Sequence, residues 1–382
     1  MEQNEKEYNY DLQPELFITT PPADENAGEE INSLSKSGYQ FLKENNIEEA
    51  RNAFNKILQL EENNNYALVG LGDCERKCGN FSEATRYYSS CLATHPGNNY
   101  ALFGLADCYK ALGNFHKAID IWEQYLAHDD TNITVLTRVA DAYRKIKDFR
   151  KSKNVYLKVL DMEETNAYAL IGLGHLNYDF KEYRDALYYW TRMVEVSPSH
   201  VDIRVLTSIG NCHRKLKTFR DGLPYFEKAL EMDPTNFYAL FGIADCYRGM
   251  NQQSRSIDYW NKILEIDPKN KVILTRAGDA YRNIGDYKTA TEYYNRAMDI
   301  DFDIYAALGL ALICKGEGKY REAEARLEKL IQDDEKNFRL YIDLADCYIK
   351  SGDRHKALDL LRRFQRFGIR NQLINEMVES LA

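Results

Sequence analysis

The chain repeats itself with a period close to 34 residues, and this feature limits its fold more than any other. The segment ALFGLADCYKALGNFHKA at 101–118 recurs as ALFGIADCYRGMNQQSRS at 239–256, and LTRVADAYRKIKDFRKS at 136–152 recurs as LTRAGDAYRNIGDYKTA at 274–290. Ten such units fit end to end between residues 31 and 371 of the 382. A chain of this kind stacks similar units on one another instead of folding around one central core.

Each unit contains two runs of apolar and small residues with helical spacing. The second unit shows the pattern through Leu68, Leu71 and Gly72 in the first run, Gly79 at the break, Phe81, Ala84 and Tyr88 in the second run, and Pro96 at the end. We therefore predict an all-α protein made of antiparallel helix pairs.

The unit resembles the tetratricopeptide repeat. Position 8, where the two helices of that family approach closely, is small in all ten units: Gly38, Gly72, Ala106, Ala140, Gly174, Gly210, Ala244, Gly278, Ala311 and Ala345. Position 11 holds Tyr109, Tyr143, Tyr247, Tyr281 and Tyr348, position 24 holds Trp122, Trp190 and Trp260 in alternate units, and position 32 holds Pro96, Pro198, Pro234 and Pro268. The resemblance implies an α-solenoid, a right-handed superhelix in which the first helix of each pair lines the concave side.

The segments at the two ends of the repeat array differ from it. Residues 1–33 carry nine acidic side chains and one lysine, so they account for most of the net charge of −9. We predict a disordered acidic tail over residues 1–30, ten repeats over 31–371 and a capping helix over 372–382. Gly222 and Pro224 in the sixth unit, which two extra residues precede, predict a local change of twist near 198–224.

Composition argues against several classes of protein. No run approaches the roughly 18 apolar residues of a membrane span, and the first residues lack the pattern of a secretory signal, so we expect a cytoplasmic protein without a membrane partner. The cysteines and histidines show no metal-ligand spacing, and no nucleophile or phosphate-loop motif is recognisable. We expect no metal, no cofactor, no small-molecule ligand and no enzymatic activity. The five cysteines at position 10 are expected to be buried: Cys74, Cys108, Cys212, Cys246 and Cys347.

The positions that the family points into its groove hold a regular pattern of charge. Position 9 carries Asp73, Asp107, Asp141, Asp245, Asp279 and Asp346, with His175 and Asn211 between them, and position 12 carries Arg76, Lys110, Arg144, Arg214, Arg248, Arg282 and Lys315. Positions 2 and 5 add Tyr66, Tyr100, Tyr168, Tyr238, Tyr305, Phe103 and Phe241. Tyrosine and arginine are the residues that concentrate binding energy. Two alternatives stay open: Asp–Arg pairs within one helix, and packing of the tyrosines at helix starts.

These patterns predict a non-catalytic scaffold that holds an extended peptide or a partner helix in the concave groove. The alternative is an RNA-binding repeat protein, which the interleaved aspartates and the lack of basic charge disfavour. A chaperone-tail binder is disfavoured because position 5 lacks lysine and position 9 lacks asparagine in most units. The sequence leaves self-association open. It also suggests that Tyr8–Ile18 in the acidic tail could lie in the groove as a weak internal competitor.

Overall fold

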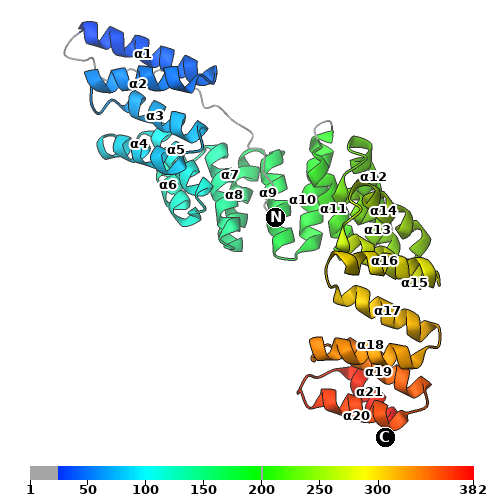
Figure 1. The fold of residues 1–382 in the computed structure, drawn as a ribbon. Coiled ribbons are helices and arrows are strands. Elements are labelled where there is room, and N and C mark those ends of the chain that lie inside the picture. The colour runs from blue at the N-terminus through cyan, green and yellow to red at the C-terminus, as the bar shows by residue number, and fades with distance from the viewer. Residues whose placement is uncertain (1–24, 199–200) are drawn as a thin grey trace. The chain divides into compact units, whose positions relative to one another are not determined.

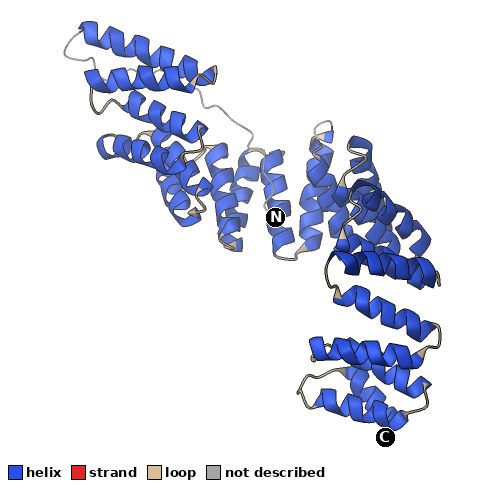
Figure 2. Ribbon diagram, in the orientation of Figure 1, coloured by secondary structure: helices blue, strands red, loops and turns tan. Residues whose placement is uncertain are grey.

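The computed structural model describes residues 25–198 and 201–382, and the secondary structure in these ranges is helical (Figures 1 and 2). The chain divides into two compact units, Met1–Ser197 and Pro198–Ala382. The first contains α1 (Glu25–Lys43), α2 (Ile47–Leu60), α3 (Asn65–Lys77), α4 (Phe81–Thr94), α5 (Asn99–Ala111), α6 (Phe115–His128), α7 (Ile133–Lys145), α8 (Phe149–Met162), α9 (Ala167–Asp179) and α10 (Tyr183–Val196). The second contains α11 (Ile203–Lys215), α12 (Phe219–Met232), α13 (Phe237–Gly249), α14 (Gln253–Ile266), α15 (Lys271–Asn283), α16 (Tyr287–Ile300), α17 (Ile304–Gly316), α18 (Tyr320–Asp333), α19 (Phe338–Lys350), α20 (Arg354–Gln365) and α21 (Gln372–Leu381).

Within each unit, every odd-numbered helix packs against the even-numbered helix that follows it, and each pair packs on the next. The odd-numbered helices α1 to α19 are the first helices of the ten repeats, and the even-numbered helices are the second. The predicted all-α architecture of stacked helix pairs is confirmed.

Side chains cap nearly every first helix. The residue before α5, Asn98, accepts a hydrogen bond from the backbone N–H of Ala101, which satisfies one of the unpaired donors of the first turn. The same cap occurs at Asn64, Asn132, Asn166, Asp202, Asn236, Asn270, Asp303 and Asn337. The sequence therefore sets where these helices begin.

The turn inside each pair needs one residue in the left-handed backbone region. Glycine takes this place at Gly79, as predicted, with a φ of 80°, and also at Gly113, Gly285, Gly318 and Gly352. The remaining repeats use Asn45, Lys147, Lys181, Lys217 and Asn251. The turn is thus kept even where the residue is less suited to it.

An aromatic ring at position 24 forms the centre of the interface that each of the first eight repeats makes with the next repeat. Tyr88 is fully buried between the first helix of its own repeat and that of the next. A Cβ atom on Gly72 of α3 would stand 2.6 Å from this ring, and one on Gly104 of α5 would stand 2.4 Å from it. Phe54, Tyr156, Phe226 and Tyr294 each face a glycine of the next repeat in the same way. Only a residue without a side chain lets the ring approach the helix backbone so closely.

Tryptophan changes this arrangement in alternate repeats. Trp122, Trp190 and Trp260 are also fully buried. The next first helix carries Arg138 after Trp122 and Arg276 after Trp260, at the position where glycine follows a phenylalanine or tyrosine ring, whereas Ser208 follows Trp190. Two of the three tryptophan interfaces therefore place an arginine on the same helices as the charged residues predicted at positions 9 and 12, which we call the charge ladder.

The N-terminal end departs from the predicted boundary, whereas α21 at the C-terminal end lies within the range predicted for the capping helix. Helix α1 begins at Glu25, so residues 25–30, which were predicted to belong to the disordered tail, are helical. The rest of the tail, with Tyr8–Ile18, lies outside the described residues. At the other end, Ile374 of α21 is buried against Phe364 and Tyr341, whereas Leu373 is 56% exposed. Helix α12 continues through Pro224, and the change of twist near 198–224 stays a prediction.

The position-10 cysteines are buried free thiols, as predicted. Burial raises the pKa of Cys74, Cys108, Cys212 and Cys246 to about 12. Such thiols stay protonated and act as small apolar side chains at the interface of the two helices.

Candidate binding surface

Most of the predicted site residues lie partly exposed on the first helices. The position-2 tyrosines are the most accessible: Tyr100 is 38% exposed, Tyr168 43% and Tyr238 46%. Tyr66 and the ladder residues Asp73, Arg76, Asp107, Lys110, Asp141, Arg144, Arg214, Arg248, Asp279 and Arg282 are half-buried or exposed, as are His175 and Phe241. Phe103 and Asp245 are buried, with 9% and 7% of their surface exposed.

Two sets of charged residues on these helices are internal copies of each other. Copy 1 consists of the ladder residues of α3, α5 and α7 in the first unit together with Arg138, and copy 2 consists of those of α11, α13 and α15 in the second together with Arg276. Each residue of copy 2 stands 138 positions after its counterpart, as Asp245 does after Asp107. Each copy lies within one compact unit.

In copy 1, α3 supplies its own ion pair. Arg76 contacts Asp73 at 3.2 Å, and the hydroxyl of buried Tyr88 donates to Asp73 at 2.7 Å. The interface ring therefore reaches the charge ladder and holds its first carboxylate in place. The structure confirms here the alternative of an Asp–Arg pair within one helix.

The second ion pair of copy 1 joins two successive first helices, α5 and α7. Arg138 of α7 donates to Asp107 of α5 at 2.9 Å, and its guanidinium lies 5.0 Å from the centre of the Phe103 ring. The two side chains of the ion pair are only 19% and 11% exposed. Phe103 is thus covered by a cation rather than presented to a ligand.

The last pair of copy 1 links α7 to α9. Arg144 donates to Asp141 at 2.7 Å on its own helix and to Asp179 at 2.8 Å on the next first helix. Burial alone would raise the pKa of Asp141, but the neighbouring guanidinium of Arg144 holds that pKa below its ordinary value. Copy 1 therefore pairs most of its cations with carboxylates.

Copy 2 gathers three arginines around one carboxylate. Asp245 of α13 accepts a hydrogen bond from Arg214 of α11 at 2.8 Å and contacts Arg248 at 2.7 Å. Arg276 of α15 stands 3.7 Å from the same carboxylate, beyond hydrogen-bond length. Burial alone would raise the pKa of Asp245, but Arg214 and Arg248 lower it.

The aromatic ring beneath these arginines is Phe241. The guanidinium groups of Arg214 and Arg276 lie 5.5 and 5.3 Å from its centre. The ring itself leans edge-on against buried Trp260 at 5.2 Å. Phe241, held in place by Trp260, therefore positions the guanidinium groups of Arg214 and Arg276.

The end of copy 2 repeats the tyrosine contact of copy 1. Tyr294 donates to Asp279 at 2.7 Å, and Arg282 donates to the Tyr294 oxygen at 3.3 Å. The next first helix, α17, has Gly316 at the position of Asp179. Arg282 thus lacks the second carboxylate that Arg144 has, and contacts Asp279 at 3.5 Å.

His175 interrupts the ladder in the fifth repeat. Its ring lies edge-on to buried Trp190, with centres 5.2 Å apart. A histidine here replaces the aspartate of the neighbouring repeats, so the carboxylate row of the first unit ends on α7 at this position.

Three charged residues of this surface were not predicted: Arg138, Arg276 and Asp179. The two arginines stand at position 6, and their signal in the sequence was the replacement of the usual glycine after Trp122 and Trp260. Asp179 had no such signal, because its role depends on the approach of α9 to Arg144.

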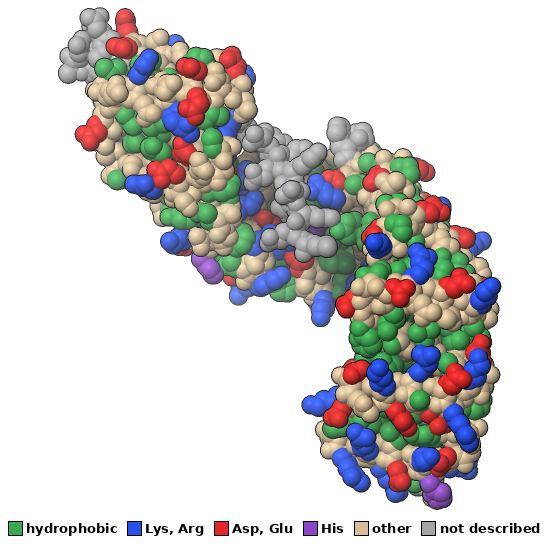
Figure 3. Space-filling model, viewed as in Figure 1, with side chains coloured by type: hydrophobic (Ala, Val, Ile, Leu, Met, Phe, Trp, Pro, Cys, Tyr) green, Lys and Arg blue, Asp and Glu red, His purple; other side chains and the backbone are tan. Residues whose placement is uncertain are grey.

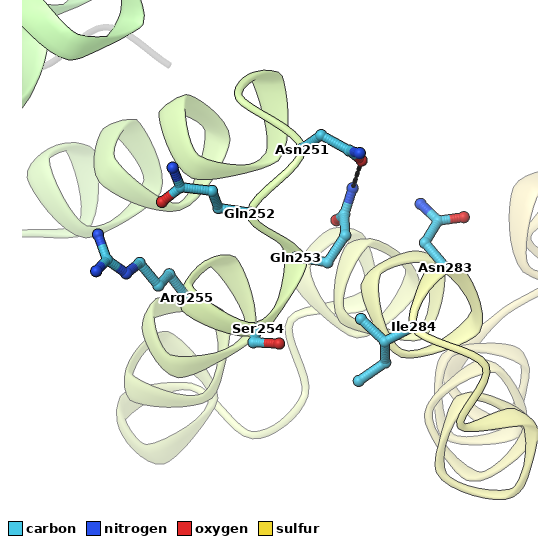
Figure 4. Close-up of a pocket in the computed structure, with 7 residues that line it drawn as sticks. All are labelled: Asn251, Gln252, Gln253, Ser254, Arg255, Asn283 and Ile284. Atoms are coloured by element: carbon cyan, nitrogen blue, oxygen red, sulfur yellow. Dashed lines mark hydrogen bonds between the residues drawn. The ribbon is translucent and has the colours of Figure 1, made fainter.

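A polar hollow of about 500 Å³ lies away from the ladder, where the turn between α13 and α14 meets the end of α15 (Figure 4). Its lining residues are Asn251, Gln252, Gln253, Ser254, Arg255, Asn283 and Ile284. Gln253 donates to Asn251 at 3.4 Å, while Gln252 and Arg255 point away from Ile284. No predicted site residue lines it, and its side chains do not converge on one point.

The described residues form neither a metal site nor a membrane span. Residues 25–198 and 201–382 contain no group of three His, Cys, Asp or Glu side chains arranged to bind a metal ion. No helix in the same ranges is both long enough and apolar enough to cross a bilayer.

Comparison with known proteins identifies the family to which the repeats belong. Models of the tetratricopeptide repeat match residues 78–146 and 316–365, residues 225–258, and residues 133–166, 203–236 and 273–304. The C-terminal part of a TPR repeat-containing protein from Cytophaga hutchinsonii is similar, with a TM-score of 0.57 and 19% identity over 63% of this chain and 99% of that chain. A tetratricopeptide repeat protein from Parabacteroides merdae has a TM-score of 0.50 and 17% identity over 66% of this chain and 99% of that one. No curated protein matches the chain. Because the matched segments together cover more than half of its length, the chain belongs to the tetratricopeptide repeat family.

Proposed function

We propose that this protein is a non-catalytic scaffold that holds an extended peptide or a partner helix against the first helices of its repeats. The observation that carries this proposal is the combination of exposed tyrosines with a charge ladder on the same helices. Tyr100, Tyr168 and Tyr238 expose 38 to 46% of their surface. Arg248, on the same helix as Tyr238, keeps 45% of its side chain exposed. Tyrosine and arginine supply both apolar contact and directional hydrogen bonds to a peptide.

The ladder also suits the recognition of a polypeptide backbone. Successive first helices present carboxylates and guanidiniums at regular spacing, so an extended chain can meet a donor or an acceptor at each repeat. The RNA-binding alternative gains no support, because Asp107 and Asp245 stand among the very arginines that would have to contact phosphates. A partner protein is the better match to this mixture of charges.

Affinity capture with matched variants tests the proposal. The full chain is used as bait after nuclease treatment, alongside the double variant Tyr100→Ala, Tyr238→Ala. The control is Tyr188→Ala on the second helix α10, where the side chain is 59% exposed. We expect the double variant to lose its protein partners, with a weakening of at least about 2 kcal/mol as for interface hot spots, and the control to retain them.

A melting curve separates binding from folding. Both variants change exposed side chains, so each should melt within a few degrees of the unaltered chain. Capture that is equal for all three proteins, or that disappears with nuclease, would refute a peptide-binding role for these tyrosines.

A further inference from the structure

The arginine cluster of copy 2 has an excess of positive charge that copy 1 lacks. Copy 1 and its neighbour α9 hold four cations against four carboxylates: Arg76, Lys110, Arg138 and Arg144 against Asp73, Asp107, Asp141 and Asp179. Copy 2 holds four cations against two carboxylates: Arg214, Arg248, Arg276 and Arg282 against Asp245 and Asp279. The same helices therefore carry a different net charge in the two units.

A replacement in α11 removes the carboxylate with which copy 1 pairs the arginine of the same helix. Asp73 of copy 1 corresponds to Asn211 in copy 2, and an amide cannot neutralise a guanidinium. Arg76 pairs with Asp73 on its own helix, whereas Arg214 has no such carboxylate and turns to Asp245 on the next first helix. Asp245, which also holds Arg248, is then occupied when Arg276 approaches it.

Arg276 is consequently left with an incomplete set of partners. Its counterpart Arg138 donates to Asp107 at 2.9 Å, but Arg276 comes no nearer than 3.7 Å to Asp245. Its side chain is 36% exposed, against 19% for Arg138. Burial lowers the pKa of Arg276; the Asp245 carboxylate opposes this, but the positive charges of Arg248 and Arg214 act in the same direction as burial. A guanidinium in this position would gain from a carboxylate brought by a ligand.

We propose that Arg248 and Arg276 bind a carboxylate of an acidic peptide segment in a protein partner. The two guanidiniums flank the occupied Asp245 and keep 45% and 36% of their side chains exposed, and Phe241 fixes the direction of Arg276. Guanidinium groups bind carboxylates through paired, charge-assisted hydrogen bonds. The inference deepens the proposed function, on which it rests, by naming the chemistry of the ligand.

Exposed apolar side chains on the neighbouring helices indicate which other residues the acidic peptide should contain. Tyr238 is 46% exposed at the start of α13, and Val272 is 54% exposed at the start of α15. Further along, Tyr305 of α17 is 66% exposed, and hydrophobic side chains form a band across the second unit at the level of α16 and α17 (Figure 3). An acidic segment with neighbouring apolar residues fits this surface.

The test uses a labelled oligoglutamate peptide, with oligoglutamine of the same length as the neutral control, against the full chain. We expect oligoglutamate alone to bind, with an affinity that falls as salt rises because surface charges are screened. Arg276→Gln should weaken this binding about fivefold, since it removes a charge-assisted hydrogen bond. Arg138→Gln in copy 1 and Lys269→Gln on an exposed loop should change it by less than about twofold.

Exchanging aspartate and asparagine at position 9 of the two copies tests whether Asn211 is the cause of the excess positive charge. Asn211→Asp supplies Arg214 with a carboxylate on its own helix and should weaken oligoglutamate binding about threefold. Asp73→Asn makes the opposite change in copy 1 and should strengthen it, while the amide oxygen still accepts from Tyr88. Thermal melting confirms that each variant is folded.

Equal losses from Arg276→Gln, Arg138→Gln and Lys269→Gln would overturn the proposal, because binding would then follow total charge alone. Equal binding of oligoglutamate and oligoglutamine would overturn it as well. Neither result depends on the capture of a partner by the tyrosine surface, so a failure here is distinguishable from a failure of the scaffold proposal.

Discussion

Copy 1 and copy 2 are two surfaces of one chain that are built from similar repeat sequences. In copy 1 these two arginines pair with different carboxylates: Arg76 pairs with Asp73 within α3, and Arg138 pairs with Asp107 of α5. In copy 2 one buried carboxylate, Asp245, has three arginines around it. The helices and their caps are equivalent, but Tyr88, which donates to Asp73 in copy 1, corresponds to Phe226 in copy 2. The difference therefore lies in the polar and charged side chains that the same fold carries.

The comparison shows how a repeat protein can diversify its surface without altering its fold. The ring at position 24 and the small residue at position 8 hold the helices, and substitutions there would disturb the stack. Position 9 only adjusts which charges meet. With asparagine at 211 instead of aspartate, Arg214 pairs with Asp245 on the next first helix, and Arg276 is left incompletely paired.

The largest expected effect comes from removing the shared interface ring. Trp122→Ala in the first unit and Trp260→Ala in the second each empty a fully buried site. Each should lower the free energy of unfolding by about 3–5 kcal/mol, as large-to-small core changes do. Guanidinium denaturation followed by circular dichroism measures this, with Tyr188→Ala as the exposed control. Markedly unequal losses would show that the two copies differ in packing too.

A smaller effect distinguishes the two carboxylates. Asp245→Asn leaves three arginines without their shared anion and should cost about 3 kcal/mol, because a buried ion network loses one partner. Asp107→Asn should cost less, about 1–2 kcal/mol, since it leaves a single interhelical arginine unpaired. Denaturation midpoints of the two variants, measured under the same conditions, give the comparison. A greater loss for Asp107→Asn would contradict the assignment of Asp245 as the centre of copy 2.

Acid should weaken both copies. The pKa values of Asp141 and Asp245 are lowered in the folded chain, so the folded state favours their charged forms. Their stabilising contribution is present above the unfolded pKa of about 4 and is lost as pH falls through the lowered folded values. Melting temperatures between about pH 6 and pH 3 should therefore fall. Asp245→Asn should flatten this profile; an unchanged profile would mean that other carboxylates dominate.

The smallest effect concerns the acidic tail, which lies outside the described residues. If Tyr8–Ile18 competes for the surface, removal of residues 1–24 should tighten oligoglutamate binding by about twofold at low salt, and the gain should shrink at high salt. The measurement is the same fluorescence titration with and without these residues. Unchanged affinity at both salt concentrations would show that the tail does not compete for the arginine cluster of copy 2.

The repeat period, the helix pairs and the small residues at position 8 were readable from the sequence, because each depends on contacts within one repeat or with the next. The structure confirms the turn at Gly79, and it adds the caps that begin helices after Asn98 and Asn236. The buried cysteines were predictable for the same reason: position 10 follows the phase of the helix.

The pairing of charges was decided only by the tertiary structure. The sequence shows Asp245 and Arg248 three residues apart, but it does not show that Arg214 and Arg276 come from neighbouring helices to the same carboxylate. The capture of Arg144 by Asp179 is equally hidden. Helix formation follows local spacing, whereas an ion pair forms wherever long, flexible side chains from separate helices meet, and that depends on how closely the repeats stack.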